Sequence, residues 1–430
     1  MSEHISEHII VCSNTSHMLK GEKVLRKEGI PVRLIPTPKK YGQLCTTSIV
    51  IPTELKSSAE SILRKEKVKY IGIYKLEPLR VDNLLLNDNN VKEDFANIIR
   101  KIESGQDLTL KEVERLLAAE NPAEVEVLLS AGDRMRKKAV GDVVEIRGIV
   151  EFSNYCRKNC NYCGLRKANN SLKRYRMTPR EIVETAVEMR KFGISTVILQ
   201  SGEDPWYTEE IMVGIIREIK RQTGMRITLS IGERPRWELE AFRKAGANNY
   251  LLKIESANRK IFELAHPDDD YDVRVRNIKD LKELGYLTGS GSIVGLPGQR
   301  PEHLAEDIMF LKEMGIGMVG IGPFIPARNT PFENMPPGDL LMSLKMVAVA
   351  RLVLKNVFIP STTAMATLSP DGQRRGLLSG ANVIMVNFTP QNLKKSYEIY
   401  SNKAVITLKT AVELIKSTER KLPPYIKEKV

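Results

Sequence analysis

The feature that most constrains this chain is a cysteine-rich stretch at residues 152–164, FSNYCRKNCNYCG. Three of the five cysteines lie in it, Cys156, Cys160 and Cys163, in a CxxxCxxC spacing. The stretch directly follows an apolar run at 143–152 that has the composition of a β-strand. Three thiols this close together on a loop suit a metal better than a disulfide, so the fold has to present this loop at the end of a strand.

The number of cysteines favours an iron–sulfur cluster over zinc. A cubane cluster ordinarily takes four cysteines, so three would leave one iron open to a substrate. Structural zinc sites close with four ligands and usually have a second CxxC pair, which this chain lacks. A loop with cysteines by chance is the remaining alternative. CxxxCxxC with Tyr162 before the third cysteine resembles the radical S-adenosylmethionine (radical-SAM) enzymes, which implies one 4Fe-4S cluster and S-adenosylmethionine as cofactors.

Length and composition leave room for a large core. The chain has 430 residues, 42% of them hydrophobic, which suits one large barrel and a smaller domain. No segment approaches the roughly 18 to 20 consecutive apolar residues of a membrane span, and the N-terminus lacks a basic-then-apolar signal. An odd number of cysteines, three of them clustered, fits a reducing compartment. We therefore expect a cytoplasmic protein with no membrane partner.

The net charge of +13 would suggest nucleic acid if it lay on one face. It is instead concentrated at the two ends, because residues 1–80 carry a net +6, residues 394–430 a net +5, and residues 81–393 only +2. We therefore expect no nucleic-acid partner. The basic ends keep the chain soluble or contact an acidic protein.

Residues 1–80 are predicted to form a small α+β domain. Apolar runs and helical stretches follow one another in the order βαββαβ, which predicts a ferredoxin-like antiparallel sheet with its helices on one side. The apolar runs are 9–12, 32–35, 47–51 and 70–74, and the helical stretches are 16–28 and 53–65.

About the first 77 residues resemble a family of sulfur- or selenium-carrier-like domains. Cys45 takes the place of that family's cysteine, but Thr46 follows it where glycine is common. A docking or regulatory module with an incidental cysteine is the alternative. Cys12, inside a predicted strand, is interpreted as a small buried hydrophobe.

The remaining chain is predicted to be of the α/β class. Residues 81–141 are interpreted as a linker with three lead-in helices, 142–410 as a radical-SAM (β/α)8 TIM-type barrel and 411–430 as a basic C-terminal tail. Strands and helices alternate through the barrel. The eight predicted strands are 143–152, 195–200, 226–231, 248–252, 287–294, 317–321, 357–362 and 382–386.

One barrel helix can be predicted in detail. Thr178 caps it, Pro179 occupies its first turn, Glu181 completes a T-x-x-E capping box and Gly193 ends it. An apolar stripe along this helix should pack on the sheet. Its members are Ile182, Val183, Ala186, Met189 and Phe192.

In a βα barrel the catalytic groups come from the C-terminal ends of the strands. After the second predicted strand come Ser201, Gly202 and Glu203, and the resemblance implies that they hold the amino group of S-adenosylmethionine. After the fourth, Lys253 and Glu255 place a cation and a carboxylate near the mouth. Glu255 is a candidate cofactor contact, and a surface pair is the alternative for both residues.

Two further cofactor contacts are predicted. Arg274 matches an arginine that in related enzymes binds the carboxylate of S-adenosylmethionine, with Arg276 as its rival. The glycine-rich stretch at 289–299 lacks the GxGxxG spacing of a dinucleotide site. The resemblance instead places Ile293 and Gly295 against the adenosyl group.

Several stretches together resemble the HydE family of FeFe-hydrogenase maturases between about residues 95 and 405. They are 145–164, 174–184, 199–205, 292–299, 318–326 and 361–367. The resemblance implies an organometallic substrate, an iron–carbonyl–cyanide–cysteine complex, in a buried cavity. It also implies an external electron donor, flavodoxin or ferredoxin, and other maturases as partners. The implied cavity residues are Arg147, Met318, Thr362, Thr363 and Met365.

The chain departs from this family in two places. Lys253-Ile254-Glu255-Ser256 stands where the family commonly has Arg-His-Glu-Thr, and lysine cannot reproduce the bidentate contact of arginine. Residues 391–430 contain no cysteine, so the second cluster of some members is not expected.

The sequence therefore predicts a radical-SAM enzyme that reductively cleaves S-adenosylmethionine to a 5′-deoxyadenosyl radical, in assembly of the hydrogenase H-cluster. One alternative is a radical-SAM amino-acid isomerase or C–C bond-forming enzyme of the methylornithine-synthase kind. Another is a non-catalytic sulfur or metal carrier with Cys45 as its delivery thiol.

Overall fold

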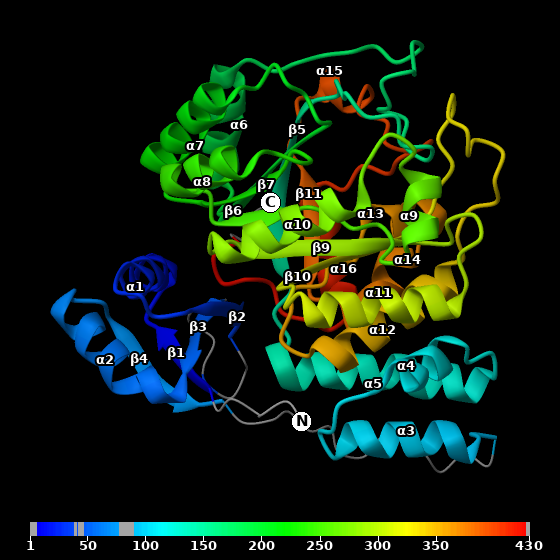
Figure 1. Cartoon of the computed structure of the whole chain (residues 1–430), viewed down its shortest axis with the longest axis horizontal. Coiled ribbons are helices and arrows are strands. Elements are labelled where there is room, and N and C mark those ends of the chain that lie inside the picture. Colours follow the sequence, from blue (N-terminus) through cyan, green and yellow to red (C-terminus); the bar gives the residue numbers. More distant parts are fainter. Residues whose placement is uncertain (1–6, 38–40, 42–46, 77–89, 427–430) are drawn as a thin grey trace.

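A computed structural model describes residues 7–37, 41, 47–76 and 90–426. An N-terminal antiparallel domain lies at one end of a parallel barrel, and a layer of helices flanks the barrel beside it (Figure 1). None of the helices in these ranges is long and apolar enough to cross a membrane.

The predicted βαββαβ order of the N-terminal domain is confirmed. Its sheet is antiparallel, in the order β2-β3-β1-β4. Cys12 is fully buried in one apolar cluster with residues of both helices, as predicted, whereas Cys45 lies outside the described residues. The elements are β1 Glu7–Cys12, α1 Thr15–Lys27, β2 Arg33–Pro36, β3 Thr47–Pro52, a short 3-10 turn Thr53–Leu55, α2 Lys56–Lys65 and β4 Tyr70–Lys75.

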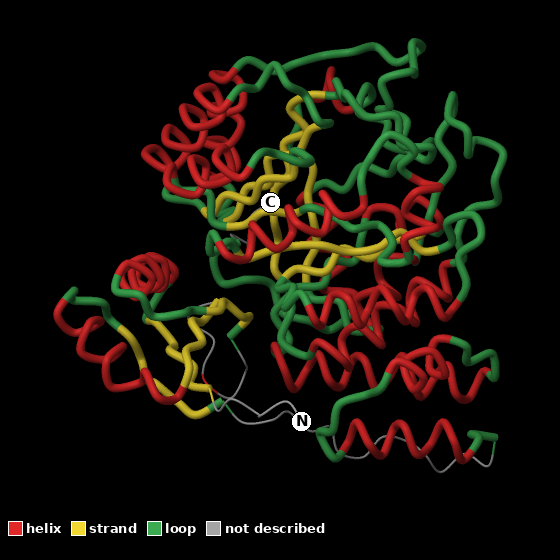
Figure 2. Tube along the Cα trace, in the orientation of Figure 1, coloured by secondary structure: helices red, strands yellow, loops and turns green. Residues whose placement is uncertain are grey.

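Three lead-in helices precede the barrel, as predicted. They are α3 Glu93–Glu103, α4 Leu110–Leu117 and α5 Pro122–Val140. Helix α5 packs on α12, Leu340–Leu354, and α4 packs on α11, Pro301–Glu313. Figure 2 shows these helices as a layer outside the strands of the barrel.

Seven parallel strands form the barrel sheet within the described residues, in the order β10-β9-β8-β7-β6-β5-β11. The predicted strand at 357–362 is not a regular strand: Phe358 bridges Met318 of β10, and Pro360 bridges Val383 of β11. Proline has no N–H for a continuous ladder, so this segment joins the two edges through single bridges. The strands are β5 Glu145–Ser153, β6 Thr196–Ser201, β7 Arg226–Ser230, β8 Asn249–Leu251, β9 Leu287–Val294, β10 Met318–Pro323 and β11 Val383–Asn387.

The helix predicted from its capping box is α6, Pro179–Lys191, and Thr178 and Glu181 cap it reciprocally. Its apolar stripe is buried except at the end, where the prediction for Phe192 is wrong. Phe192 is the C-cap, is 38% exposed and contacts the ring of Phe388. Since the helix ends there, the side chain no longer follows the buried face.

The other helices of the barrel alternate with its strands or follow the last one. They are α7 Glu209–Thr223, α8 Arg236–Ala245, α9 Arg259–Ala265, α10 Tyr271–Glu283, α13 Thr363–Leu368, α14 Gly372–Leu378, α15 Gln391–Lys394 and α16 Leu408–Ser417.

The C-terminal segment predicted as a basic tail is packed on the barrel. Helix α16 crosses the predicted boundary at 410, and its Ala411 and Ile415 belong to the main apolar core. Lys421 accepts a backbone hydrogen bond from Val144 at 3.0 Å, just before β5. These residues therefore complete the barrel.

The N-terminal domain covers the base of the barrel, where the strands begin. Leu34 belongs to an apolar cluster with Leu287, Met318, Phe358 and Val383 of the barrel. Polar contacts accompany it: Arg226 of β7 donates to Thr47 Oγ1 at 2.7 Å, and Arg243 of α8 donates to Glu22 at 2.8 Å. The opposite end, where the strands finish, is the end that carries the cysteine loop.

Candidate functional site

The cysteine loop leaves β5 and is fixed by backbone hydrogen bonds on several sides. Arg157 N donates to Glu203 O at 3.0 Å in the loop after β6, and Gly164 N donates to Ile399 O at 3.0 Å in the C-terminal segment. Cys156, Cys160 and Cys163 are free thiols, each half-buried. The loop is therefore held in a defined shape by elements far away in the sequence.

The surroundings of the three thiols disfavour free thiolates. Burial raises the pKa of Cys156, Cys160 and Cys163, the last to about 12. Repulsion between neighbouring sulfurs adds to this at Cys160. A bound cationic centre reverses that cost because it binds the thiolate form. Among the described residues no group of three His, Cys, Asp or Glu side chains could hold a single metal ion.

The loop after β6 packs directly against the cysteine loop. A Cβ at Gly202 would lie 2.3 Å from Tyr155 O and 2.8 Å from Cys156 Cβ, so only glycine permits this contact. Ser201 Oγ donates to Gly202 O at 2.6 Å, and Glu203 accepts from Arg157 Nε at 3.0 Å. The structure thus brings the predicted residues 201–203 beside Cys156.

Arg274 lies inside an ion network next to this loop, whereas its rival Arg276 is exposed. The Arg274 guanidinium donates to Glu233 Oε1 at 2.6 Å, to Lys253 O at 2.8 Å and to Asp269. Burial raises the pKa of Glu233, while ion pairing with Arg274 offsets burial and lowers that of Asp269. Glu233 and Asp269 were not predicted, although the acidic run after His266 was a visible signal.

A chain of polar contacts links Cys160 to the barrel mouth. Cys160 Sγ lies 3.2 Å from His266 Nδ1, and His266 Nε2 lies 3.4 Å from Tyr162 Oη. Tyr162 Oη donates to Glu255 Oε1 at 3.4 Å, and Glu255 Oε2 lies 2.7 Å from Lys253 Nζ. Burial lowers the pKa of His266 to about 3, so the ring is neutral. At the barrel mouth, Lys253 and Glu255 form an ion pair with each other.

Glu255 has a left-handed backbone, with φ of 62°. This conformation is strained for a residue with a side chain and is typical of functional sites. Its N–H donates to Gly291 O, and its carbonyl accepts from Ile293 N, both at 3.0 Å. The backbone of Glu255 is thus held against β9.

Of the two predicted adenosyl residues, Ile293 lies on an apolar wall, together with Tyr162. Tyr162 and Ile293 both pack against a cluster that includes Leu296 and Phe324. Gly295 has φ of 91°, and a Cβ there would lie 2.5 Å from Gly338 Cα. The loops that contain Gly295 and Gly338 therefore pass close to each other next to the wall, and only glycine fits at position 295.

The residues predicted to line the substrate cavity lie in different parts of the barrel. Arg147 and Met318 lie low in the barrel, where Arg147 Nη1 is 2.8 Å from Met318 Sδ beside a space of about 20 Å³. Thr362 lies higher, next to Gly322, and its buried Oγ1 has no hydrogen-bond partner among the described residues. Thr363 begins α13. Met365 packs against Gly376 in the hydrophobic core, so the structure does not bring it to Arg147 and Met318.

A polar group from the C-terminal segment was not predicted. Buried Glu151 of β5 pairs with Lys403 and accepts from Asn387 Nδ2 at 2.9 Å. Buried Tyr397 accepts from Gln200 Nε2 at 3.4 Å. No local pattern links residues about 200 positions apart, so these contacts depend on the closed barrel.

Comparison with known proteins agrees with this geometry. Residues 150–311 match the family described as "Radical SAM superfamily", and residues 7–75 match "Putative Se/S carrier protein-like". The chain is 47% identical over 309 residues to the FeFe-hydrogenase maturase subunit HydE of Thermotoga maritima, covering 72% of this chain and 88% of that protein.

Two more distant relatives share the fold. The 3-methylornithine synthase of Methanosarcina acetivorans is 28% identical over 294 residues, covering 68% of this chain and 83% of that protein. The crystal structure of the methylornithine synthase PylB superposes with a TM-score of 0.69 at 26% identity, covering 76% of this chain and 98% of that chain.

The family implies one 4Fe-4S cluster and S-adenosylmethionine as cofactors. The donor set fits this cluster, because three thiols share one loop and Cys12, the other described cysteine, lies in the N-terminal domain. With its cysteine loop at the C-terminal end of a parallel barrel, the chain belongs to the HydE family of radical-SAM enzymes.

Proposed function

We propose that the chain is a maturase that acts in assembly of the H-cluster of an FeFe-hydrogenase. The observation that carries this proposal is the 47% identity to a HydE maturase subunit over 88% of that protein. The substrate is a small organometallic complex, bound in the interior of the barrel.

Each part of the site has a role in this proposal. Cys156, Cys160 and Cys163 hold the cluster, which when bound supplies an electron that cleaves S-adenosylmethionine to methionine and a 5′-deoxyadenosyl radical. Residues 201–203 orient the amino group of S-adenosylmethionine beside Cys156. Arg274 orients its carboxylate, sharing its guanidinium with Glu233 and Asp269.

The remaining predicted residues position the adenosyl group and the substrate. Tyr162 and Ile293 form the apolar wall for the adenosine, next to Gly295, and Glu255 offers a carboxylate at the mouth. Thr362 offers an unpartnered hydroxyl to a polar substrate, Thr363 lies beside it at the start of α13, and Arg147 and Met318 form the floor. Flavodoxin or ferredoxin supplies the electron, other maturases are partners, and the protein acts in the cytoplasm.

A complementation assay tests this function. The chain, expressed in an anaerobic hydrogenase assembly system that lacks only its HydE component, should restore hydrogen evolution. The Cys160→Ala variant should not restore it. If the wild-type chain cleaves S-adenosylmethionine at a normal rate yet restores no hydrogenase, a methylornithine-synthase-like reaction replaces maturation as the proposed function.

A further inference from the structure

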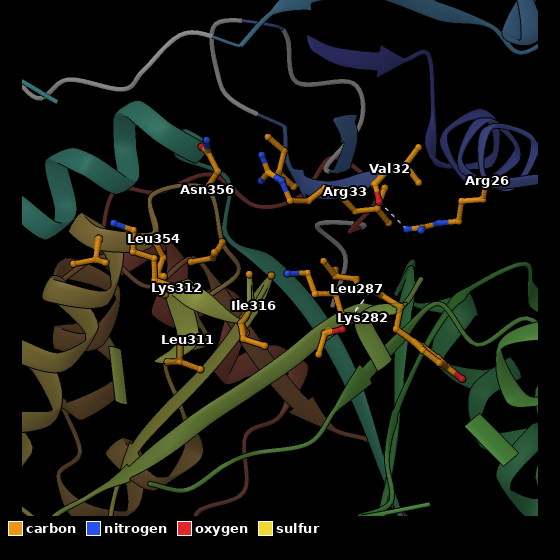
Figure 3. A pocket seen from close by; sticks show the side chains of 18 residues that line it. Arg26, Val32, Arg33, Lys282, Leu287, Leu311, Lys312, Ile316, Leu354 and Asn356 are labelled. Carbon is orange, nitrogen blue, oxygen red and sulfur yellow. Dashed lines mark hydrogen bonds between the residues drawn. The ribbon is translucent and has the colours of Figure 1, made fainter. Parts of the chain in front are cut away.

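A pocket of about 350 Å³ lies between the N-terminal domain and the base of the barrel (Figure 3). Its volume falls within the range of small-molecule sites in proteins. One wall comes from α1 and β2, and the other from the residues where β9 and β10 begin and α10, α11 and α12 end. In Figure 3, Arg33 and Lys282 approach the pocket from these two sides.

The charges around this pocket are of one sign. Four cationic residues line it, Arg26, Arg33, Lys282 and Lys312, and no aspartate or glutamate is among its lining residues. The rest of the lining is mostly apolar and includes Leu34, Leu287, Leu311, Ile316 and Leu354. A lining of cationic and apolar side chains is complementary to an anion that carries an apolar body.

Carboxylates outside the pocket pair with three of the four cations. Glu22 pairs with Arg26 at 3.2 Å, Glu7 with Arg33 at 2.5 Å and Asp107 with Lys312 at 3.1 Å. Lys282 forms no ion pair in the part of the chain that the structure describes. Its ammonium is therefore the charge most available to a bound anion.

A second feature of the pocket is an unused acceptor. Asn356 Oδ1 is buried and has no hydrogen-bond partner among the described residues. A buried acceptor without a partner is unfavourable, and a ligand hydroxyl or N–H could satisfy it. Asn356 stands on the barrel side of the pocket, beside Val357.

We propose that this pocket binds a small organic anion, a phosphate ester or a carboxylate with an apolar body, and that the ligand bridges the N-terminal domain and the barrel. The apolar body lies over Leu287, Leu311 and Ile316, and the anionic group lies between Arg33 and Lys282. The site is separate from the radical chemistry because it lies at the base of the barrel, where the strands begin. A bound anion would strengthen the contact between the two domains by binding both.

Isothermal titration calorimetry on the full-length protein tests this site with defined probes. The probes are phenyl phosphate and 3-phenylpropionate as anions, benzyl alcohol as the neutral analogue and inorganic phosphate without an apolar body. Lys282→Glu reverses the available charge. Lys279→Glu is its matched control, because it makes the same change of charge on α10 at an exposed residue outside the pocket.

We expect one or both aromatic anions to bind more tightly than benzyl alcohol and inorganic phosphate, with the tighter of the two identifying the anionic group. Lys282→Glu should weaken that binding about tenfold, and Lys279→Glu less than about twofold. A thermal shift with the tighter anion, at the same anion concentration, should be smaller in Lys282→Glu than in the control.

Three results would overturn the proposal. One is the absence of binding by either aromatic anion up to about 10 mM. Another is equal affinity for benzyl alcohol, which would indicate apolar binding alone. The third is equal weakening by the two lysine variants, which would indicate a general effect of charge. Since none of these measurements involves S-adenosylmethionine, their outcome is independent of the proposed maturase function.

Discussion

Substitution of Gly202 by alanine should separate the loop that is proposed to orient S-adenosylmethionine from the loop that holds the cluster. The added Cβ would lie 2.3 Å from Tyr155 O and 2.8 Å from Cys156 Cβ. Normal contacts between carbon and other heavy atoms begin near 3.4 Å, so the loops must move apart by about 1 Å. Overpacking of this kind costs about 1–3 kcal/mol, which the barrel should tolerate.

The effect on chemistry should be much larger than the effect on stability. A displacement of about 1 Å at a reacting centre lowers rates by about 100-fold. We therefore expect Gly202→Ala to keep its fold and to form 5′-deoxyadenosine about 100-fold more slowly than the wild type. The assay is anaerobic reconstitution, iron determination and quantification of 5′-deoxyadenosine after addition of dithionite.

Gly214→Ala is the matched control for this variant. Gly214 lies within α7, and a Cβ there would meet nothing within 4 Å. Alanine is favoured over glycine in a helix by about 1 kcal/mol, so this variant should be fully active and slightly more stable. A rate for Gly202→Ala within twofold of the Gly214→Ala rate would refute the account of the contact between the two loops.

Two further predictions concern stability. Glu22→Gln should destabilise the protein by about 1–3 kcal/mol in urea unfolding, because buried Glu22 accepts hydrogen bonds from Arg26 and Arg243 where the N-terminal domain meets the barrel. The control, Glu60→Gln, removes the charge of an exposed ion pair and should leave stability unchanged. Equal effects of the two variants would contradict the prediction. Burial raises the pKa of Asp307 to about 7 in the folded state, whereas an aspartate in the unfolded chain has a pKa near 4. Between pH 4 and pH 7 Asp307 is therefore protonated in the folded state and ionised in the unfolded state. Stability consequently falls as pH rises through that range. From pH 5 to pH 7 the wild type should lose about 2 kcal/mol relative to Asp307→Asn, and a pH-independent difference would argue against a protonated Asp307.

Local patterns in the sequence predicted the elements that depend on neighbouring residues. The capping box at Thr178 and Glu181 and the cysteine loop after β5 are read from positions a few residues apart, and both occur in the structure. The same holds for the alternation of strands and helices in both domains. These features follow from backbone geometry that a short segment carries by itself.

Contacts between distant segments could not be predicted in this way. Hydrophobicity placed Phe192 in the apolar stripe, but the helix ends at this residue and leaves it exposed. Pro360 interrupts what reads as a strand. His266 approaches Cys160 only because the barrel brings α9 to the cysteine loop. The docking of the N-terminal domain on the barrel base likewise arises from long-range packing.

The most direct test of the central claim is reductive cleavage of S-adenosylmethionine by the reconstituted protein and by two cysteine variants. The wild type and Cys12→Ala, whose thiol lies buried in the N-terminal domain, should both form 5′-deoxyadenosine with dithionite. Cys160→Ala should form none above background. Product from Cys160→Ala at the wild-type rate would contradict the assignment of the cluster to Cys156, Cys160 and Cys163.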